Sequence, residues 1–245
     1  MRTIFIADAH LVSPTATNYS LLLRFLDELN GEVDTLYLLG DLFDFWLGFP
    51  SNPYPQYDAV LDALERLVIN GCKLVYFEGN HDFHLGTIFS QRLKARIQTG
   101  PATEIIQGKK LYVCHGDQIN KKDRIYRLMR FLLRTRLVAA CIRYFPPALA
   151  FSVRERLQAR SRASYDFKTA HWDYRQIILD FASSLQKQGY DGLITGHFHL
   201  AINEDLPETD FSVLSLGDWM DQFTYGEMRH GELCLINYSP DRSIP

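Results

Sequence analysis

Five short segments of this chain gather the side chains that most often bind metal ions. Each follows a stretch of apolar residues, and they read Asp8-Ala9-His10, Gly40-Asp41, Gly79-Asn80-His81-Asp82, His115-Gly116-Asp117 and Gly196-His197-Phe198-His199. One such segment alone has an ordinary explanation, since a lone His often satisfies a hydrogen bond at the edge of a core and a lone Asp often caps a turn. Five of them in succession predict a shared site.

The types of donor narrow the chemistry of that site. Imidazole and carboxylate ligands suit Mn²⁺, Fe²⁺ or Zn²⁺ better than Ca²⁺, and a set without thiolates argues against a structural zinc site. Seven ligands are too many for one transition metal but fit two ions that share a carboxylate. Two such ions can activate water and stabilise an in-line displacement at phosphorus. The seven candidate ligands are Asp8, His10, Asp41, Asn80, His115, His197 and His199.

The elements that must position these residues follow from the apolar pattern. Buried strands are predicted at residues 3–7, 35–39 and 73–77, with amphipathic helices at 19–29 and 57–69 between them. This alternation predicts an α/β fold with a parallel sheet and crossover helices. Reactive residues then collect beyond the carboxyl ends of the strands, where Asp8, Asp41 and Asn80 stand. Further strands are predicted at 111–114, 192–195, 212–216 and 232–238.

The charge of the chain is unevenly distributed. Residues 121–168 hold 13 Lys or Arg against 3 Asp or Glu, while the rest holds 13 basic and 26 acidic residues. Helices are predicted in and after this basic insert at 123–135, 137–145, 150–162 and 171–186. Three interpretations stay open: a solvated helical subdomain, a cap that meets an anionic partner such as a membrane surface through residues such as Arg127, Arg130 and Arg134, or nucleic-acid binding. The last is disfavoured because the insert lacks the interleaved aromatic residues that stack on bases.

Cysteine usage and hydropathy indicate the compartment. The four cysteines are far apart in the sequence and form no Cys-x-x-Cys pair, which is typical of reduced thiols in a cytoplasmic protein. The start of the chain is too short for a signal peptide before Asp8, and no apolar stretch is long enough to span a bilayer. We therefore expect a cytoplasmic protein of one domain, 1–245.

On the five segments, in this order, the chain resembles the calcineurin-like metallophosphoesterases from Asp8 to His199. The resemblance implies a four-layer αββα sandwich with a helical cap inserted at 121–168. It also implies two divalent ions. One would be held by Asp8, His10, Asp41 and His199, and the other by Asp41, Asn80, His115 and His197, with Asp41 as the bridge.

Within this family the chain is most similar to the branch that hydrolyses the pyrophosphate of a nucleotide-linked, doubly acylated sugar in lipid A synthesis, usually with Mn²⁺. The similarity lies in the runs 40–48 and 80–86 and in the helical insert after His115. It implies a peripheral location on the cytoplasmic face of the inner membrane, and an undetermined oligomeric state. The substrate-binding residues that it implies are Asn80, His81, Asp123, Ser161, Lys168 and His197.

One residue departs from that branch, which usually carries Arg where this chain has His81. Arg clamps a phosphate through two hydrogen bonds, whereas His can also protonate a leaving group. The resemblance makes His81 and Asp82 the candidate catalytic residues, with Asp82 either orienting His81 or capping the turn. Two other functions remain open: a phosphodiesterase of another specificity, such as a nuclease, and a non-catalytic binding scaffold.

Overall fold

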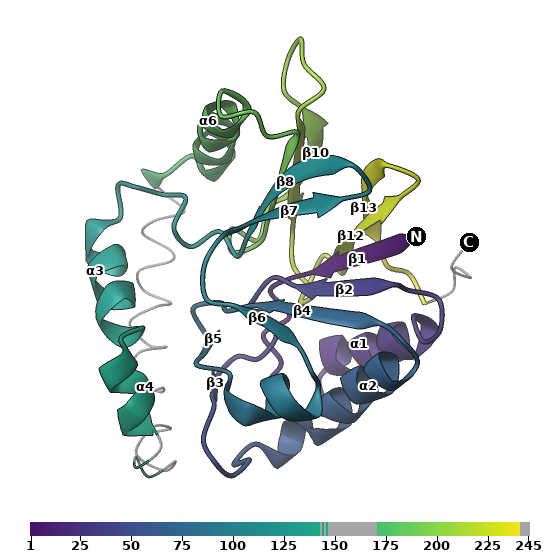
Figure 1. The fold of residues 1–245 in the computed structure, drawn as a ribbon, viewed down its shortest axis with the longest axis vertical. Coiled ribbons are helices and arrows are strands. Elements are labelled where there is room, and N and C mark those ends of the chain that lie inside the picture. Colours follow the sequence, from purple (N-terminus) through teal and green to yellow (C-terminus); the bar gives the residue numbers. More distant parts are fainter. Residues whose placement is uncertain (143, 145, 147–170, 241–245) are drawn as a thin grey trace.

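Two stacked β-sheets form the centre of the molecule, which a computed structural model describes for residues 1–142, 144, 146 and 171–240. The first sheet has the strand order β13-β12-β1-β2-β4-β6, and the second has the order β10-β11-β9-β8-β7 (Figure 1). The strands of the first sheet are β1 (Arg2–Ile6), β2 (Thr35–Leu38), β4 (Lys73–Phe77), β6 (Arg96–Gln98), β12 (Thr224–Arg229) and β13 (Glu232–Asn237). Those of the second are β7 (Ala102–Ile106), β8 (Lys109–Cys114), β9 (Gly192–Thr195), β10 (Ala201–Asp205) and β11 (Ser212–Leu216).

Alternation along the strands places apolar side chains on both faces of the first sheet. In β1, Ile4 and Ile6 belong to one buried cluster, whereas Phe5 and the following Ala7 belong to another. The first cluster joins the sheet to helices α1 (Thr17–Glu28) and α2 (Asp58–Ile69), and the second joins the two sheets. A third cluster packs the second sheet against α6 (Tyr174–Gln186). Three apolar interfaces separate four layers, and the expected αββα sandwich is confirmed.

The predicted parallel order is confirmed for the N-terminal part of the first sheet. Strand β1 pairs in parallel with β2, β2 with β4, and β4 with β6. The hairpin of β12 and β13 was not anticipated as a partner of this sheet, yet β12 pairs antiparallel with β1. Short elements complete the N-terminal part, namely β3 (Trp46–Leu47), β5 (Asp82–Phe83), a 3₁₀ turn at Pro55–Tyr57 and a π-helical turn at Ile88–Arg92.

The insert begins with two helices, α3 (Arg124–Leu133) and α4 (Arg136–Ile142), which lie to one side of the sandwich (Figure 1). Both agree with the predicted helices. The predicted helix at 150–162 and the boundary at 168 lie outside the described residues, so the division into domain and cap stays a prediction. In the part of the chain that the structure describes, no helix is both long and apolar enough to cross a membrane.

Candidate metal centre

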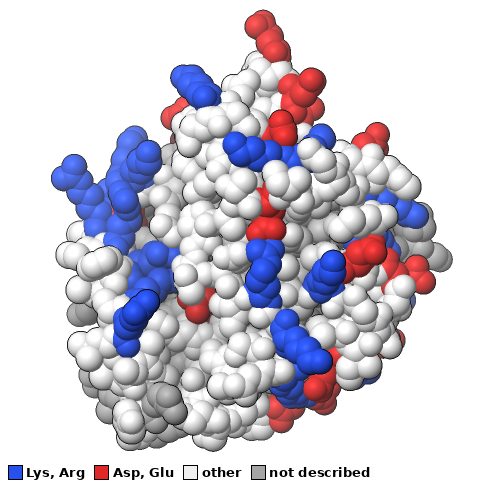
Figure 2. Space-filling view, in the orientation of Figure 1, with Lys and Arg blue, Asp and Glu red and all other residues white. Residues whose placement is uncertain are grey.

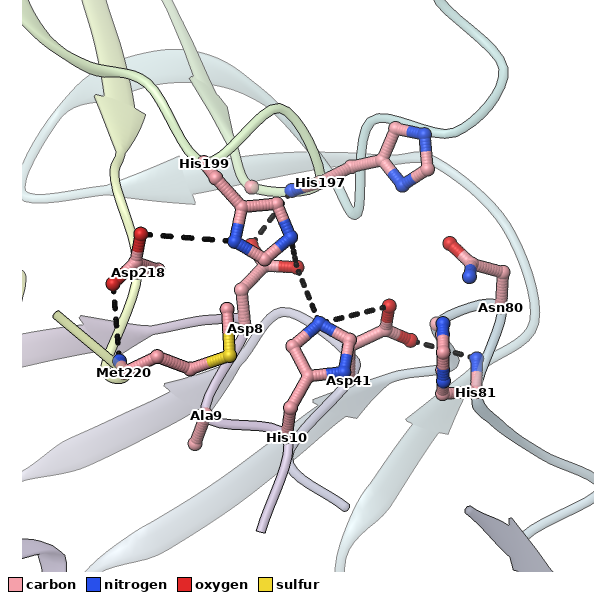
Figure 3. Close-up of polar contacts among 12 residues, drawn as sticks. Asp8, Ala9, His10, Asp41, Asn80, His81, His197, His199, Asp218 and Met220 are labelled. Atoms are coloured by element: carbon pink, nitrogen blue, oxygen red, sulfur yellow. Dashed lines mark hydrogen bonds and ion pairs between the residues drawn. The ribbon is translucent and has the colours of Figure 1, made fainter. Parts of the chain in front are cut away.

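The seven candidate ligands come together at the carboxyl ends of β1, β2, β4, β8 and β9. Figure 3 labels Asp8, His10, Asp41, Asn80, His197 and His199. Five of them have a positive φ, a conformation that non-glycine residues seldom adopt. Strain of this kind is concentrated at functional sites, where the surrounding structure maintains it. The five residues are Asp8, His10, Asp41, His197 and His199, with φ values of 54°, 42°, 54°, 71° and 51°.

Asp8, His10 and His199 form the first of two ligand groups, in which one donor atom from each lies within 4.8 Å of the others. The Asp8 carboxylate is fully buried, and its Oδ2 accepts a hydrogen bond of 2.7 Å from the main-chain N–H of His197. Its Oδ1 and the Nε2 of His10 are both buried and have no hydrogen-bond partner among the described residues. Two unsatisfied lone-pair atoms that face one centre fit a divalent cation, since burial without a partner is costly.

Asp41 stands between the two groups. Its Oδ2 lies 3.7 Å from Nε2 of His10 and 3.6 Å from Nε2 of His115, so one atom faces the histidines of both groups. Its Oδ1 accepts a 2.8 Å hydrogen bond from the main-chain N–H of His81, which fixes the carboxylate. A side chain at Gly79 would not fit, because a Cβ there would lie 2.0 Å from Asp41 Oδ1. The glycine therefore admits the carboxylate that a bridging position requires.

Asp41, His115 and His197 form the second ligand group. The ring of His115 is oriented by a 2.7 Å contact between its Nδ1 and the main-chain oxygen of Leu39. This assigns the N–H to Nδ1 and turns Nε2 toward the Oδ1 of Asn80, 3.1 Å away. The carboxamide of Asn80 thus completes this group from the loop that follows β4.

Burial and neighbouring charges set the pKa values in the centre. Burial lowers the pKa of His10 and of His197 to about 3, so both rings are neutral near pH 7 and offer lone pairs to a cation. Burial raises the pKa of Asp8 to about 6. For Asp41, burial opposes ionisation, but the nearby rings of His115, His81 and His10 hold its pKa well below the usual range. Burial opposes protonation of His115 and His199 as well, but nearby carboxylates raise the pKa of both rings, that of His199 to about 9. The centre therefore combines imidazole and carboxylate donors, a set that suits divalent metals.

His81 and Asp82 point to different tasks. The Nδ1 of His81 lies 2.8 Å from the main-chain oxygen of Asp44, and its ring meets that of His10 edge-on. A third potential ligand group, His10, Asp44 and His81, arises from this proximity. The fully buried carboxylate of Asp82 instead accepts hydrogen bonds from the main-chain N–H groups of Asp41, Leu42, Phe43 and Gly79 and from the hydroxyl of Tyr76. The described partners of Asp82 therefore lie in the turns that carry the candidate ligands. They do not include the ring of His81.

Helix α3 is tied to the centre by its polar side. Tyr126 and Arg130 both bind the carboxylate of Asp117, and Arg134 donates to the main-chain oxygen of Gly79 at 2.6 Å. These three residues are spaced four apart and so lie on one face of the helix. Arg130 and Arg134, two of the residues predicted to meet a membrane, pair instead with the buried carboxylates of Asp117 and Glu78. Arg127 is exposed, as expected, and Figure 2 shows Lys and Arg gathered over α3.

Of the substrate-binding residues predicted in the insert, the structure describes only Asp123. Asp123 is the N-cap of α3 and accepts a 3.1 Å hydrogen bond from the N–H of Tyr126. Ser161 and Lys168 lie outside the described residues. A cavity beside the second ligand group is lined in part by His115, Gln118, Lys121 and Arg130.

Sequence reasoning missed two residues that contact the ligand turns. Arg134 was read only as a surface charge, and Asp218 was not singled out at all. Asp218 lies in the turn between β11 and β12, where its Oδ2 approaches Nδ1 of His199 at 3.7 Å (Figure 3). The segment Gly217-Asp218-Trp219 at the end of an apolar strand repeats the pattern of Gly40-Asp41, which was the available signal.

Comparison with known proteins agrees with this architecture. The family model for calcineurin-like phosphoesterases matches residues 1–201. A UDP-2,3-diacylglucosamine hydrolase of Stenotrophomonas maltophilia is 32% identical over 91% of this chain and 92% of its own length. One of Aeromonas salmonicida is 29% identical, covering 98% and 96%. The solved structure of an archaeal phosphodiesterase shares the fold, with a TM-score of 0.51 at 13% identity over 97% of this chain and 100% of that one.

The matched region spans all seven candidate ligands and the five strands that present them, β1, β2, β4, β8 and β9. Family members use divalent metal ions, and the two ligand groups of this chain provide donors of the right kind. The chain therefore belongs to the calcineurin-like phosphoesterases and is a metal-dependent phosphoester hydrolase.

Proposed function

We propose that the protein hydrolyses the pyrophosphate of UDP-2,3-diacylglucosamine to UMP and 2,3-diacylglucosamine 1-phosphate. The observation that carries this proposal is the match to hydrolases of that name over more than nine-tenths of both chains. It is supported by the basic insert, because the substrate joins a charged diphosphate to two acyl chains.

The proposed centre holds two ions, with Mn²⁺ preferred and Fe²⁺ or Zn²⁺ compatible with the same donors. Asp8, His10 and His199 would hold the first, Asn80, His115 and His197 would hold the second, and Asp41 would be shared by both. When bound, such ions lower the pKa of a water molecule and neutralise charge on phosphoryl oxygens.

The chain's own residues then have separate roles. The Nδ1 of His81 faces the main-chain oxygen of Asp44 and so carries a proton, which means that Nε2 can donate a proton or a hydrogen bond to a phosphate or leaving-group oxygen when the ring is an imidazolium. His81 would also bind the substrate, together with Asn80 and His197. Asp82 holds the main chain of Asp41 in place, so we assign it to positioning and not to proton transfer.

The cap would bind the rest of the substrate through Asp123, Ser161 and Lys168 and would rest on the anionic inner membrane. The outer face of α3 supports this part of the proposal. Ile125 and Phe131 are 85% and 70% exposed, and Arg124 and Arg127 lie beside them. Apolar residues flanked by cations are typical of helices at a membrane surface.

Replacing Ile125 and Phe131 by Gln is expected to weaken binding to vesicles that contain anionic lipid, as measured by co-sedimentation. Ile69, which is 75% exposed on α2 away from the insert, gives the matched control, since Ile69→Gln should bind as the wild type does. Equal binding by all three proteins would contradict the membrane role.

The substrate is tested by incubating the protein with Mn²⁺ and UDP-2,3-diacylglucosamine and measuring UMP. Rapid UMP release with weak hydrolysis of an aryl phosphodiester is the expected result. The absence of UMP under Mn²⁺, Fe²⁺ and Zn²⁺ would refute the assignment.

His81 favours a second candidate, a phosphodiesterase of other specificity. A diester with an alkoxide leaving group needs protonation more than one that releases a sugar phosphate. Hydrolysis of a diester or of nucleic acid without UMP release would establish this alternative. Metal binding without hydrolysis of any of these substrates would instead indicate a scaffold.

A further inference from the structure

The turn from β11 to β12 carries a buried carboxylate beside the first ligand group. Asp218 is 4% exposed, and its Oδ1 accepts hydrogen bonds from the main-chain N–H groups of Met220, Asp221 and Gln222 at 3.0, 2.8 and 3.1 Å. Three bonds to one oxygen fix the carboxyl group in the turn, so its second oxygen has a defined direction.

That second oxygen faces a candidate ligand. Oδ2 of Asp218 lies 3.7 Å from Nδ1 of His199, and Nε2 of the same ring lies 4.0 Å from Oδ1 of Asp8 (Figure 3). The side-chain N–H of Gln222 donates both to Oδ2 of Asp218 at 2.6 Å and to the main-chain oxygen of His199 at 2.9 Å. The next residue, Trp219, donates its N–H to the main-chain oxygen of Asp8 at 3.1 Å. One turn therefore contacts two of the three members of the first ligand group.

We propose that Asp218 is a positioning residue that keeps the proton of His199 on Nδ1 and so leaves the lone pair of Nε2 to a divalent cation. A neutral imidazole has one N–H, and a carboxylate can only accept, so Asp218 favours the tautomer in which the nitrogen that faces it carries the proton. Such outer contacts orient metal-binding histidines and strengthen their basicity. The inference rests on the proposed metal centre.

Asp218→Asn separates this role from a merely structural one. The carboxamide oxygen of the new Asn can still accept the three main-chain hydrogen bonds that Oδ1 of Asp218 accepts. The NH₂ group of the Asn then takes the place of Oδ2. A donor then faces Nδ1, which favours the tautomer with the proton on Nε2, and that nitrogen can no longer bind a cation. Asp218→Ala instead removes the three turn bonds but leaves the ring free to take either tautomer.

The experiment is calorimetric titration of the metal-free full chain with Zn²⁺ and with Mn²⁺, alongside thermal unfolding. We expect Asp218→Asn to weaken one of two sites by about 10- to 100-fold, as removal of such outer contacts commonly does, and to weaken it at least as much as Asp218→Ala. Asp218→Ala should lower the melting temperature more. The exposed neighbour gives the matched control, and Asp221→Asn should leave both sites unchanged.

The outcomes separate this inference from the proposed function. If the wild type binds two ions and Asp218→Asn binds both with unchanged affinity, the role of Asp218 is refuted while the two-ion centre stands. The same holds if the loss of affinity follows the loss of stability, so that Ala is worse than Asn in both. If the wild type binds one ion and Asp218→Asn weakens it, Asp218 keeps its role and the second ion is refuted. A wild type that binds no ion refutes both.

Discussion

Replacing Arg134 should test how the insert is joined to the metal centre. Its guanidinium is 11% exposed and faces the Glu78 carboxylate, itself 4% exposed, with Nη1 3.2 Å from Oε2. Its Nη2 also donates to the main-chain oxygen of Gly79 at 2.6 Å. Removing one member of a buried ion pair leaves the other charge uncompensated, which typically costs about 3–5 kcal/mol. We expect Arg134→Met to lower the free energy of unfolding by about that amount.

The assay is urea unfolding of the full chain, with Arg127→Met as the matched control. Arg127 lies on the same helix but is exposed, so its replacement should change the free energy of unfolding by less than about 0.5 kcal/mol. Glu78→Gln completes a double-mutant cycle in which the effects of Arg134→Met and Glu78→Gln should fall short of additivity by about 1–3 kcal/mol. Equal costs for the two Arg variants, or simple additivity in the cycle, would show that this ion pair does not hold the helix.

The same variant should also slow catalysis. The oxygen that Arg134 binds belongs to the residue before Asn80, a proposed ligand, and small displacements of ligating groups are costly. We expect kcat for an aryl phosphodiester to fall about 10- to 100-fold in Arg134→Met under conditions where it is folded. Arg127→Met should keep the wild-type rate.

Three further predictions concern the centre itself. Asp41→Ala should lose both metal ions by calorimetry and nearly all turnover, and full turnover would refute the bridging role. Gly79→Ala should lower stability and metal affinity together, because its Cβ would meet Asp41 Oδ1 at 2.0 Å. Burial opposes ionisation of Asp117, but His115 and Arg130 hold its pKa below the usual value. Its contribution to stability is therefore present above about pH 4 and lost as the pH falls further, and Asp117→Asn should flatten that acid limb in metal-free protein.

The sequence predicted the candidate metal centre because each candidate ligand lies a few residues beyond the end of a strand. A buried strand is recognisable from its apolar run, and its end is marked where glycine and a polar residue interrupt that run. The carboxyl ends of parallel strands meet at one edge, so residues as distant as Asp8 and Asn80 could be placed together. Confirmed strands β1, β2, β4 and β9 follow this logic.

Asp218 shows where this logic ends. Strand β12 pairs antiparallel with β1, with Thr3 opposite Met228, although more than two hundred residues separate them. No local pattern specifies that pairing, and it is this pairing that brings the turn of Asp218 beside Asp8 and His199. The Gly-Asp pattern of the turn is present in the sequence, but the sequence alone does not place this turn beside Asp8 and His199.

Helix α3 shows a different limit of prediction from sequence. The position of the helix in the chain was predicted, but the direction in which its apolar side faces was not. The helix predicted at 123–135 includes the apolar residues Ile125 and Leu128, and an apolar helix face ordinarily packs on the body of the protein. The structure has the opposite arrangement, since no residue of α3 is buried and most of its apolar side chains are exposed. Because exposed apolar groups contribute little to folding, polar contacts hold the helix within the described part of the chain. One joins the main-chain oxygen of Leu133 to the His84 ring, and the others come from Tyr126, Arg130 and Arg134. The contacts of these three side chains end on Asp117 and on the loop before Asn80, so the stability of the insert and the geometry of the metal centre depend on the same hydrogen bonds.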